Sequence, residues 1–102
     1  MITSKRRPTP PGRILHEYYL KPRGLSISRF AQNTGLTRKH VSNIVHGKAN
    51  ITPETAVRFA TVLDTTAQFW LNLQNATNLF DVRGKLANWR PSEVHPGVVA
   101  TS

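Results

Sequence analysis

The chain has 102 residues, with 14 Lys and Arg against 5 Asp and Glu, which gives a formal net charge of +9. This length suits one small domain, and the positive excess favours a polyanionic partner, with nucleic acid ahead of a membrane surface. The sequence contains no cysteine, which excludes disulfides and thiolate metal sites. No apolar run approaches the roughly 20 residues of a membrane span. Lys5-Arg6-Arg7 is not followed by the apolar stretch of a secretory signal, so we expect a cytoplasmic protein.

The N-terminal part predicts an arm and a first helix. Residues 1–8 (MITSKRRP) are basic and lack periodicity, which indicates a flexible arm. The run Thr9-Pro10-Pro11-Gly12 is typical of a helix start, with Thr9 as the cap. Leu20-Lys21-Pro22 is predicted to end this helix, because proline disfavours helical backbone in the residue before it. The helically spaced apolar residues between them are Ile14, Leu15, Tyr18 and Tyr19.

The stretch from Leu25 to Lys48, LSISRFAQNTGLTRKHVSNIVHGK, predicts two short helices joined by a tight turn. Ser26 and Thr37 suit the N-cap positions of the two helices. Gly35 can adopt the positive φ that a sharp turn requires, and Gly47 ends the second helix. This arrangement is typical of a helix-turn-helix, whose second helix enters the major groove of DNA with its front end.

Burial of Val41 and Ile44, which are three residues apart, would turn the opposite face of the second helix outward. Arg and Lys can donate to guanine O6 and N7, Asn can pair with adenine, and a Thr methyl can touch a thymine methyl. The candidate base-reading residues on this outer face are Thr37, Arg38, Lys39, Ser42 and Asn43.

Phosphate contacts would fix the register of such a helix on the duplex. We expect them from backbone N–H groups at a helix start, from basic side chains near the motif, and from the arm, which could enter a minor groove. The candidate phosphate-binding residues are Ser26, Arg29, His40, Lys48, Lys5, Arg6 and Arg7.

Thr52-Pro53-Glu54 gives the clearest helix start in the chain. Thr52 caps, Pro53 takes the first helical position, and Glu54 suits the positive end of the helix dipole. Asp64 is predicted to stop this helix, although glycine would reach the left-handed conformation at lower cost. The apolar face between them comprises Ala56, Val57, Phe59, Ala60 and Leu63.

A fifth helix is predicted next, with a capping box of Thr65 and Gln68 at its start and Gly84 as its end. An aromatic residue on such a helix is usually part of the core, but the neighbours Phe69 and Trp70 cannot both face one core by helical spacing. We therefore expect one of them to serve a second surface. The predicted dimer interface comprises Trp70, Leu79, Phe80, Val82 and Trp89.

The predicted fold class is all-α, with five helices and no convincing strand. We expect the arm at residues 1–8, the helix-turn-helix domain at residues 9–84 with its motif at 25–48, and a C-terminal extension or tail at residues 85–102.

Two motifs resemble known families. The pattern LSxxxFAxxxGLTRKxVSNIxxGK resembles the helix-turn-helix of the Cro/repressor (XRE) family. The segment ITPETAVRFATVLDTTAQFWLNLQ is similar to the second half of HigA-type antitoxins, also called the VapI group. The string FWLNLQ, residues 69–74, is the more specific part of the match.

This resemblance implies a Cro/repressor-like domain that dimerises, binds a palindromic operator in its own promoter and neutralises a RelE-like, mRNA-cleaving HigB toxin. By position, the base-reading residues of the family fall on the same residues as above. RelE-like toxins are usually basic, so a partner of charge +9 should repel one over long range. Contact would then depend on apolar surface, on the few acidic residues, or on a less basic toxin.

The chain departs from the family pattern at helix ends. Where the family often begins its first helix with His-Pro-Gly-Glu, this chain has Pro10-Pro11-Gly12-Arg13. Asp64 replaces the glycine after the fourth helix, and Ala67-Gln68 replaces a frequent Pro-Glu.

Other classes of function compete with an antitoxin. No pair of the 4 histidines has metal-ligand spacing with a third ligand nearby, and no phosphate loop or nucleophile elbow is present. We therefore expect no metal, no cofactor and no catalysis. A stand-alone repressor without a toxin remains an alternative. A protein-binding module that has lost its DNA face is another, although the intact Arg38-Lys39 pair argues against such loss.

Overall fold

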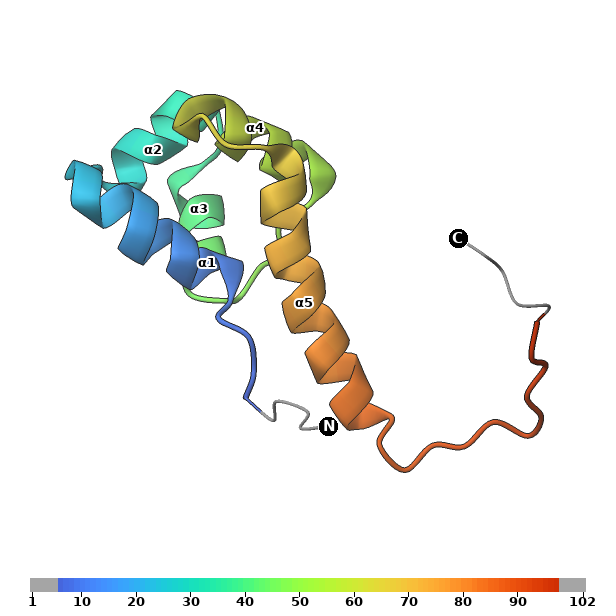
Figure 1. Ribbon diagram of the computed structural model, residues 1–102. Coiled ribbons are helices and arrows are strands. Elements are labelled where there is room, and N and C mark those ends of the chain that lie inside the picture. Colours follow the sequence, from blue (N-terminus) through green and yellow to red (C-terminus); the bar gives the residue numbers. More distant parts are fainter. Residues whose placement is uncertain (1–5, 98–102) are drawn as a thin grey trace.

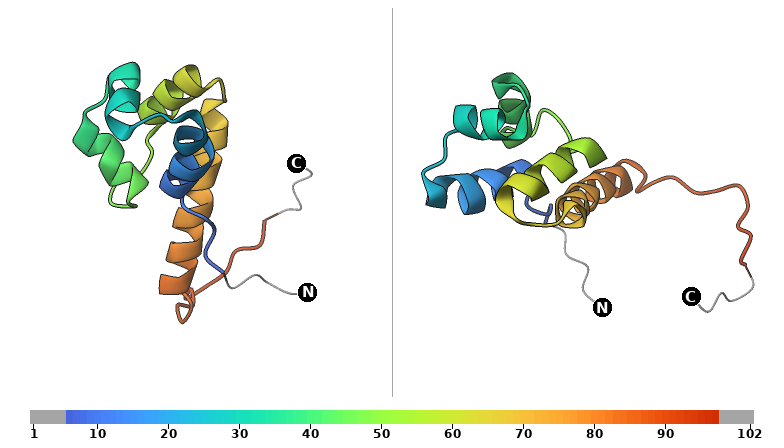
Figure 2. Two further views of the ribbon diagram at one scale, coloured as in Figure 1. Left: turned by 90° about the vertical axis from the view of Figure 1, so that its left-hand side faces the viewer. Right: turned by 90° about the horizontal axis from the view of Figure 1, so that it is seen from above.

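The computed structural model of the protein describes residues 6–97. Within this range the regular elements are all helical, which confirms the all-α fold class (Figure 1). They are α1 (Pro11–Ile14), which continues as a π-helical segment η1 (Leu15–Leu20) and a 3-10 turn η2 (Lys21–Arg23), then α2 (Ile27–Thr34), α3 (Arg38–Val45), α4 (Pro53–Leu63) and α5 (Ala67–Lys85). Two further views show that α5 extends well beyond the body formed by the other helices (Figure 2). None of the helices in residues 6–97 is both long and apolar enough to cross a bilayer.

A hydroxyl side chain caps each helix from α2 to α5 by accepting a hydrogen bond from a backbone N–H three residues further on. The predicted caps Ser26, Thr37 and Thr52 are confirmed. The capping pairs are Ser26 with Arg29 N (3.0 Å), Thr37 with His40 N (3.0 Å), Thr52 with Thr55 N (3.3 Å) and Thr66 with Phe69 N (3.1 Å).

The predicted capping box of Thr65 with Gln68 is wrong, because Thr66 is the cap of α5. Asp64 lies in the left-handed region with φ 56° and ends α4 as predicted. The N–H of Thr65 then donates to the carbonyl of Ala60 at 3.0 Å, which completes the end of α4. Since Thr65 belongs to that closing turn, α5 begins one residue later.

The first helix differs from its prediction at both ends. Its N-cap is Pro10 with no side-chain hydrogen bond, so Thr9 is not the cap. Helical backbone also continues past Pro22 to Arg23, and Gly24 ends it with φ 60°. Pro22 lies in the first turn of the 3-10 segment, where a missing N–H costs little.

Gly84 does not break α5, which continues to Lys85. Gly84 does not adopt a positive φ, and a single glycine inside a helix costs only about 1 kcal/mol relative to alanine. The helix therefore ends one residue later than predicted. Residues 86–97 are exposed and contain no helix or strand, in keeping with the predicted tail, and the last five positions of that tail lie outside the described residues.

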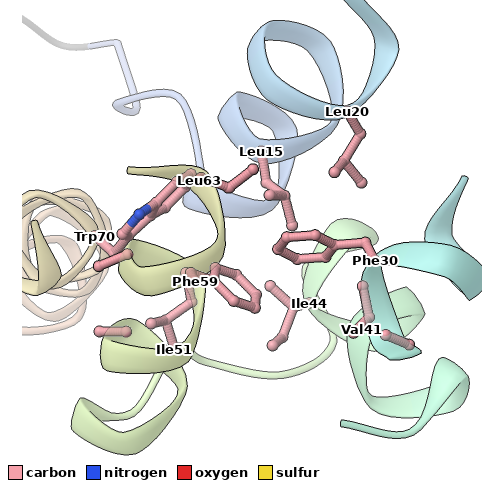
Figure 3. Close-up of a cluster of buried hydrophobic side chains, with 12 residues drawn as sticks. Leu15, Leu20, Phe30, Val41, Ile44, Ile51, Phe59, Leu63 and Trp70 are labelled. Carbon is pink, nitrogen blue, oxygen red and sulfur yellow. The ribbon is translucent and has the colours of Figure 1, made fainter. Parts of the chain in front are cut away.

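The core is enclosed by the helices together, and α5 contributes Trp70 to it (Figure 3). Its largest fully buried side chains are Trp70, Phe30, Phe59, Leu15, Leu20, Ile44 and Val41. Phe59 stacks edge-on against both Phe30 and Trp70, with centroid separations of 5.0 and 5.5 Å. Two residues predicted on apolar faces are instead exposed, namely Tyr18 (66%) and Val57 (55%).

Trp70 is 0% exposed, so its assignment to a dimer interface is wrong. Its indole Nε1 donates to Thr65 Oγ1 at 2.8 Å, which satisfies its one polar group inside the protein. Phe69 is half-buried, and both neighbours contact the ring of Tyr19 from η1. The two aromatic residues can both pack within one protomer because the ring of Tyr19 lies beside each of them.

Two contacts hold α3 against the rest of the domain. A Cβ atom on Gly12 would overlap the carbonyl oxygen of Ile44 and would lie 2.8 Å from the Cα of Val45, so α1 rests directly on the backbone of α3. On the other side, the buried amide of Gln74 accepts from Ile51 N at 2.7 Å and donates to Asn50 Oδ1 at 3.2 Å. The bonds to Ile51 and Asn50 tie the α3–α4 loop to α5. Within α5, Gln74 also donates to Asn78 Oδ1 at 3.1 Å.

Candidate nucleic-acid interface

The helices α2 and α3 form the predicted helix-turn-helix. Gly35 ends α2 with φ 75°, and the N–H of Leu36 donates to the carbonyl of Ala31 at 3.0 Å. This closed turn leaves Thr37 positioned to cap α3. The side of α3 that faces the core carries Val41 and Ile44, which are both buried as predicted.

The structure brings the predicted base-reading residues together on the other side of α3. Thr37, Arg38 and Lys39 are exposed at its front end, while Ser42 and Asn43 are half-buried one turn further on. Ser42 Oγ lies 3.3 Å from His46 Nδ1. These residues lie at the N-terminal end of α3, where side chains can reach base edges in a major groove. Their contact with DNA stays a prediction.

Arg38 is held by a residue that the sequence did not single out. Its Nε donates to the hydroxyl oxygen of Ser28, on the first turn of α2, at 2.9 Å. A hydrogen bond between side chains on different helices leaves no periodic signal in the sequence, so only the fold could identify Ser28.

The predicted phosphate-binding residues fall into two groups. Ser26, Arg29, His40 and Lys48 surround the motif, with Arg29 and Lys48 exposed and His40 half-buried. The stretch from Leu25 to Lys48 contains no Asp or Glu. Its cations therefore have no carboxylate within the motif to neutralise them.

The arm residues form the second group and are placed differently. Arg7 makes a two-pronged ion pair with Asp81 of α5, with Nε to Oδ1 at 2.9 Å and Nη2 to Oδ2 at 3.0 Å. These hydrogen bonds lower the pKa of the Asp81 carboxyl below its ordinary value of 3.8. Arg7 of the arm therefore contacts α5, and the flexibility of the arm stays a prediction. Arg6 is exposed, and Lys5 lies outside the described residues.

The predicted dimer surface is partly present on α5 and just after it. Leu79, Val82 and Trp89 are 49%, 47% and 59% exposed, and Phe80 is half-buried. Leu86, at 46% exposed, extends the same stripe and was missed, although its spacing of four from Val82 could have indicated it.

Comparison with known proteins agrees with this geometry. A family model described as "Helix-turn-helix" matches residues 17–70, which is more than half of the chain. The antitoxin HigA-1 of Vibrio cholerae is 36% identical over 85 residues, which cover 83% of this chain and 80% of that protein. The chain belongs to the HigA-type helix-turn-helix family.

This HigA-type chain is also similar to a regulator and to a solved antitoxin. An uncharacterized HTH-type transcriptional regulator of Haemophilus influenzae is 44% identical over 93 residues, covering 85% of the chain and 87% of that protein. The structure of Pseudomonas aeruginosa antitoxin HigA with the higBA promoter superposes with a TM-score of 0.81 at 29% identity, covering 90% of the chain and all of that protein (100%). The recognised family is therefore confirmed by both sequence and fold.

Proposed function

We propose that this HigA-type protein is the antitoxin of a type II toxin–antitoxin pair and represses its own operon by binding a palindromic operator. The proposal of DNA binding depends on one observation: Arg38 and Lys39 are exposed at the N-terminal end of α3, in a motif that contains no carboxylates. The P. aeruginosa relative of the same fold was solved with promoter DNA, which supports the same use of this face. The role is one of binding in the cytoplasm, without catalysis.

On the operator, α3 would lie in the major groove. Arg38 and Lys39 would donate to guanine, and Asn43 would reach adenine one turn later. Arg29, Lys48 and the helix start at Ser26 would contact flanking phosphates and set the register.

Dimerisation would use the exposed apolar stripe on α5 and just after it. Leu79, Val82, Leu86 and Trp89 are each about half exposed or more, and burying apolar surface drives association. A two-fold dimer would place two copies of α3 about 34 Å apart, on successive major grooves of a palindrome.

The toxin partner would be a RelE-like, mRNA-cleaving HigB protein. The similarity to the V. cholerae antitoxin supports this part of the proposal. Because the chain carries +9, we expect apolar surface and local acidic residues to dominate the contact.

A stand-alone repressor is the second candidate. The 44% identity to the H. influenzae regulator exceeds the 36% identity to the V. cholerae antitoxin, which favours keeping this alternative.

DNA binding and toxin neutralisation are tested by separate experiments. In an anisotropy titration with the promoter fragment of its own gene, the protein should bind more tightly than to a scrambled fragment, and Arg38→Ala with Asn43→Ala should abolish the difference while circular dichroism stays unchanged. If the double variant bound the promoter fragment as tightly as the parent protein does, the assigned reading face would be refuted. Co-expression with the product of the neighbouring gene should give a co-purifying complex and rescue growth, and if neither occurs the stand-alone repressor is favoured.

A further inference from the structure

The side chain of Arg38 is pre-positioned by α2. Ser28 is the second residue of α2, Arg38 is the first residue of α3, and the Nε–H of Arg38 donates to Ser28 Oγ at 2.9 Å. Both side chains are exposed on the same side of the helix-turn-helix. The hydrogen bond therefore joins the two helices of the motif at its solvent-facing surface.

This contact leaves a defined part of the guanidinium available. A guanidinium has five N–H donors in a rigid plane, one on Nε and two on each Nη. Ser28 takes the Nε donor, and among the described residues Arg38 has no other hydrogen bond or ion pair. The two Nη groups remain as a forked donor pair, which matches the O6 and N7 acceptors of guanine.

We propose that Ser28 determines sequence specificity by holding Arg38 in the orientation that reads one guanine through both Nη groups. This inference rests on the proposed operator binding and adds a residue to it. Fixing a long side chain before binding reduces the rotamer freedom lost on contact, and it also disfavours alternative hydrogen bonds to other bases.

The neighbour Lys39 provides an internal contrast. It is exposed like Arg38, but among the described residues it has no hydrogen bond or ion pair. A free ammonium is a compact point charge with rotatable donors, so it discriminates between bases less sharply than a fixed fork. Specificity at the Arg38 position should therefore depend on Ser28, and specificity elsewhere should not.

Apart from its bond to Arg38, the Ser28 side chain makes no hydrogen bond among the described residues. The cap of α2 is Ser26, whose hydroxyl accepts from Arg29 N at 3.0 Å. Ser28 is exposed inside the first turn, where alanine is a favourable helix residue. Ser28→Ala should therefore fold like the parent protein, and thermal unfolding would verify this.

The test measures affinity for a panel of operator fragments in which each G·C pair is replaced in turn. Arg38→Ala identifies the base pair that Arg38 reads. Ser28→Ala should lower discrimination at that pair about tenfold and leave other positions and the salt dependence unchanged. Ser28→Thr, which keeps the hydroxyl, should retain discrimination, and Ser28→Ala should have no effect in the Arg38→Ala background.

Three outcomes would overturn the inference. Unchanged discrimination in Ser28→Ala would remove Ser28 from base reading. A uniform loss on all fragments with a smaller salt slope would assign the Ser28–Arg38 pair to a phosphate contact. If the parent protein itself did not distinguish its operator from a scrambled fragment, the proposed function would fail, and the inference with it.

Discussion

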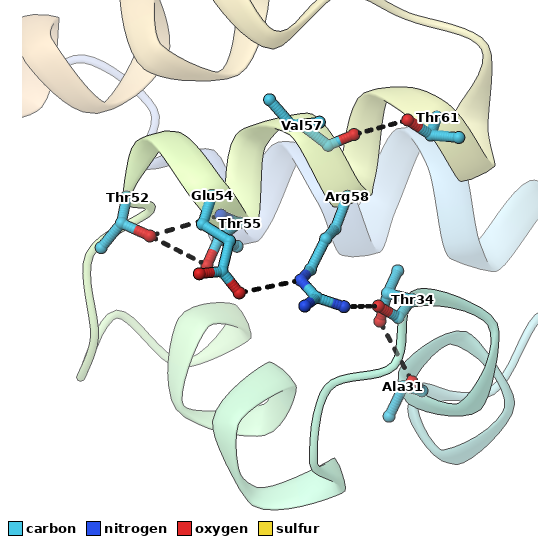
Figure 4. A network of polar contacts seen from close by, with 8 residues as sticks. All are labelled: Ala31, Thr34, Thr52, Glu54, Thr55, Val57, Arg58 and Thr61. Atoms are coloured by element: carbon cyan, nitrogen blue, oxygen red, sulfur yellow. Dashed lines mark hydrogen bonds and ion pairs between the residues drawn. The ribbon is translucent and has the colours of Figure 1, made fainter.

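Arg58 donates a hydrogen bond from Nη1 to the carbonyl oxygen of Thr34 across 2.7 Å, from α4 to the last residue of α2 (Figure 4). The same guanidinium donates from Nε to Glu54 Oε2 at 3.0 Å, which orients it. The final carbonyls of a helix lack partners within the helix and carry partial negative charge, so a cation is favourable there. Gly35 leaves room for this contact, since a Cβ on it would lie 2.8 Å from Arg58 Nη1.

Replacing Arg58 by methionine, which keeps most of the aliphatic stem, should lower the free energy of unfolding by about 1 kcal/mol. The Thr34 carbonyl would lose its charged donor, and the partial exposure of Arg58 moderates the loss. Urea denaturation followed by circular dichroism measures the change. Glu54→Gln is the matched control, because it removes the exposed ion pair and keeps the bond to Thr34. A loss in Glu54→Gln as large as in Arg58→Met would contradict this account.

Substitution of Gly12 by alanine should destabilise the domain by about 1–3 kcal/mol, because the added methyl group would overlap the backbone of α3 at Ile44. Gly84→Ala is the control inside α5, where no heavy atom beyond the adjoining backbone of the helix itself lies within 4 Å of the added Cβ. That change should stabilise the domain by about 0.5–1 kcal/mol, since alanine favours helix. Thermal unfolding of both variants should therefore show opposite shifts in Tm, and equal shifts would refute the close contact of α1 with α3.

Lys48→Ala should weaken DNA binding on all sequences alike and reduce the salt slope of log K by about one unit. Lys48 is exposed three residues beyond the end of α3, where a phosphate contact is expected. Arg83→Ala removes one cation from α5 instead, and it should leave the slope near its parent value. The measurement is anisotropy at several salt concentrations, and a loss confined to one operator sequence would identify Lys48 as a base contact.

The Arg7–Asp81 pair should make stability depend on pH in acid. Because Arg7 lowers the pKa of folded Asp81 below its ordinary value of 3.8, the pair stabilises the domain above that value and its contribution is lost as the pH falls through the lowered pKa. The stability difference between the parent protein and Arg7→Gln should therefore be constant near neutral pH and vanish in strong acid. NMR titration of the Asp81 carboxyl gives a direct reading, with its pKa higher in Arg7→Gln. An unchanged Asp81 pKa would show that the ion pair does not persist in solution.

The elements predicted best from the sequence are those that local hydrogen bonds define. Ser26, Thr37 and Thr52 cap helices because a hydroxyl can reach the N–H three residues on, and Gly35 turns because its φ is unrestricted. Such contacts lie within a few residues, so the sequence predicts them without knowledge of the fold. The helix-turn-helix and the outward face of α3 follow from them.

The error at Trp70 concerns a place where distant segments meet. Helical spacing predicts two separate surfaces for the adjacent residues Phe69 and Trp70, but the ring of Tyr19 from η1 packs against both. The sequence could not indicate that Ser28 contacts Arg38 or that Asp81 engages Arg7, because both pairs depend on how helices and arm are placed in space. These contacts concern the polar surface, which periodicity describes least well.

The amide of Gln74 sets the permitted length of the connection between α3 and α4. Its oxygen and nitrogen bind successive residues, Ile51 through its N–H and Asn50 through its side chain, so the loop must arrive in one register. An inserted or deleted residue between positions 46 and 49 would shift Asn50 and Ile51 away from the buried amide, whereas a substitution between these positions would leave both partners in place. Natural variants of this protein should therefore differ in loop sequence while conserving loop length, because the hydrogen bonds of Gln74 can form only with a loop of that length.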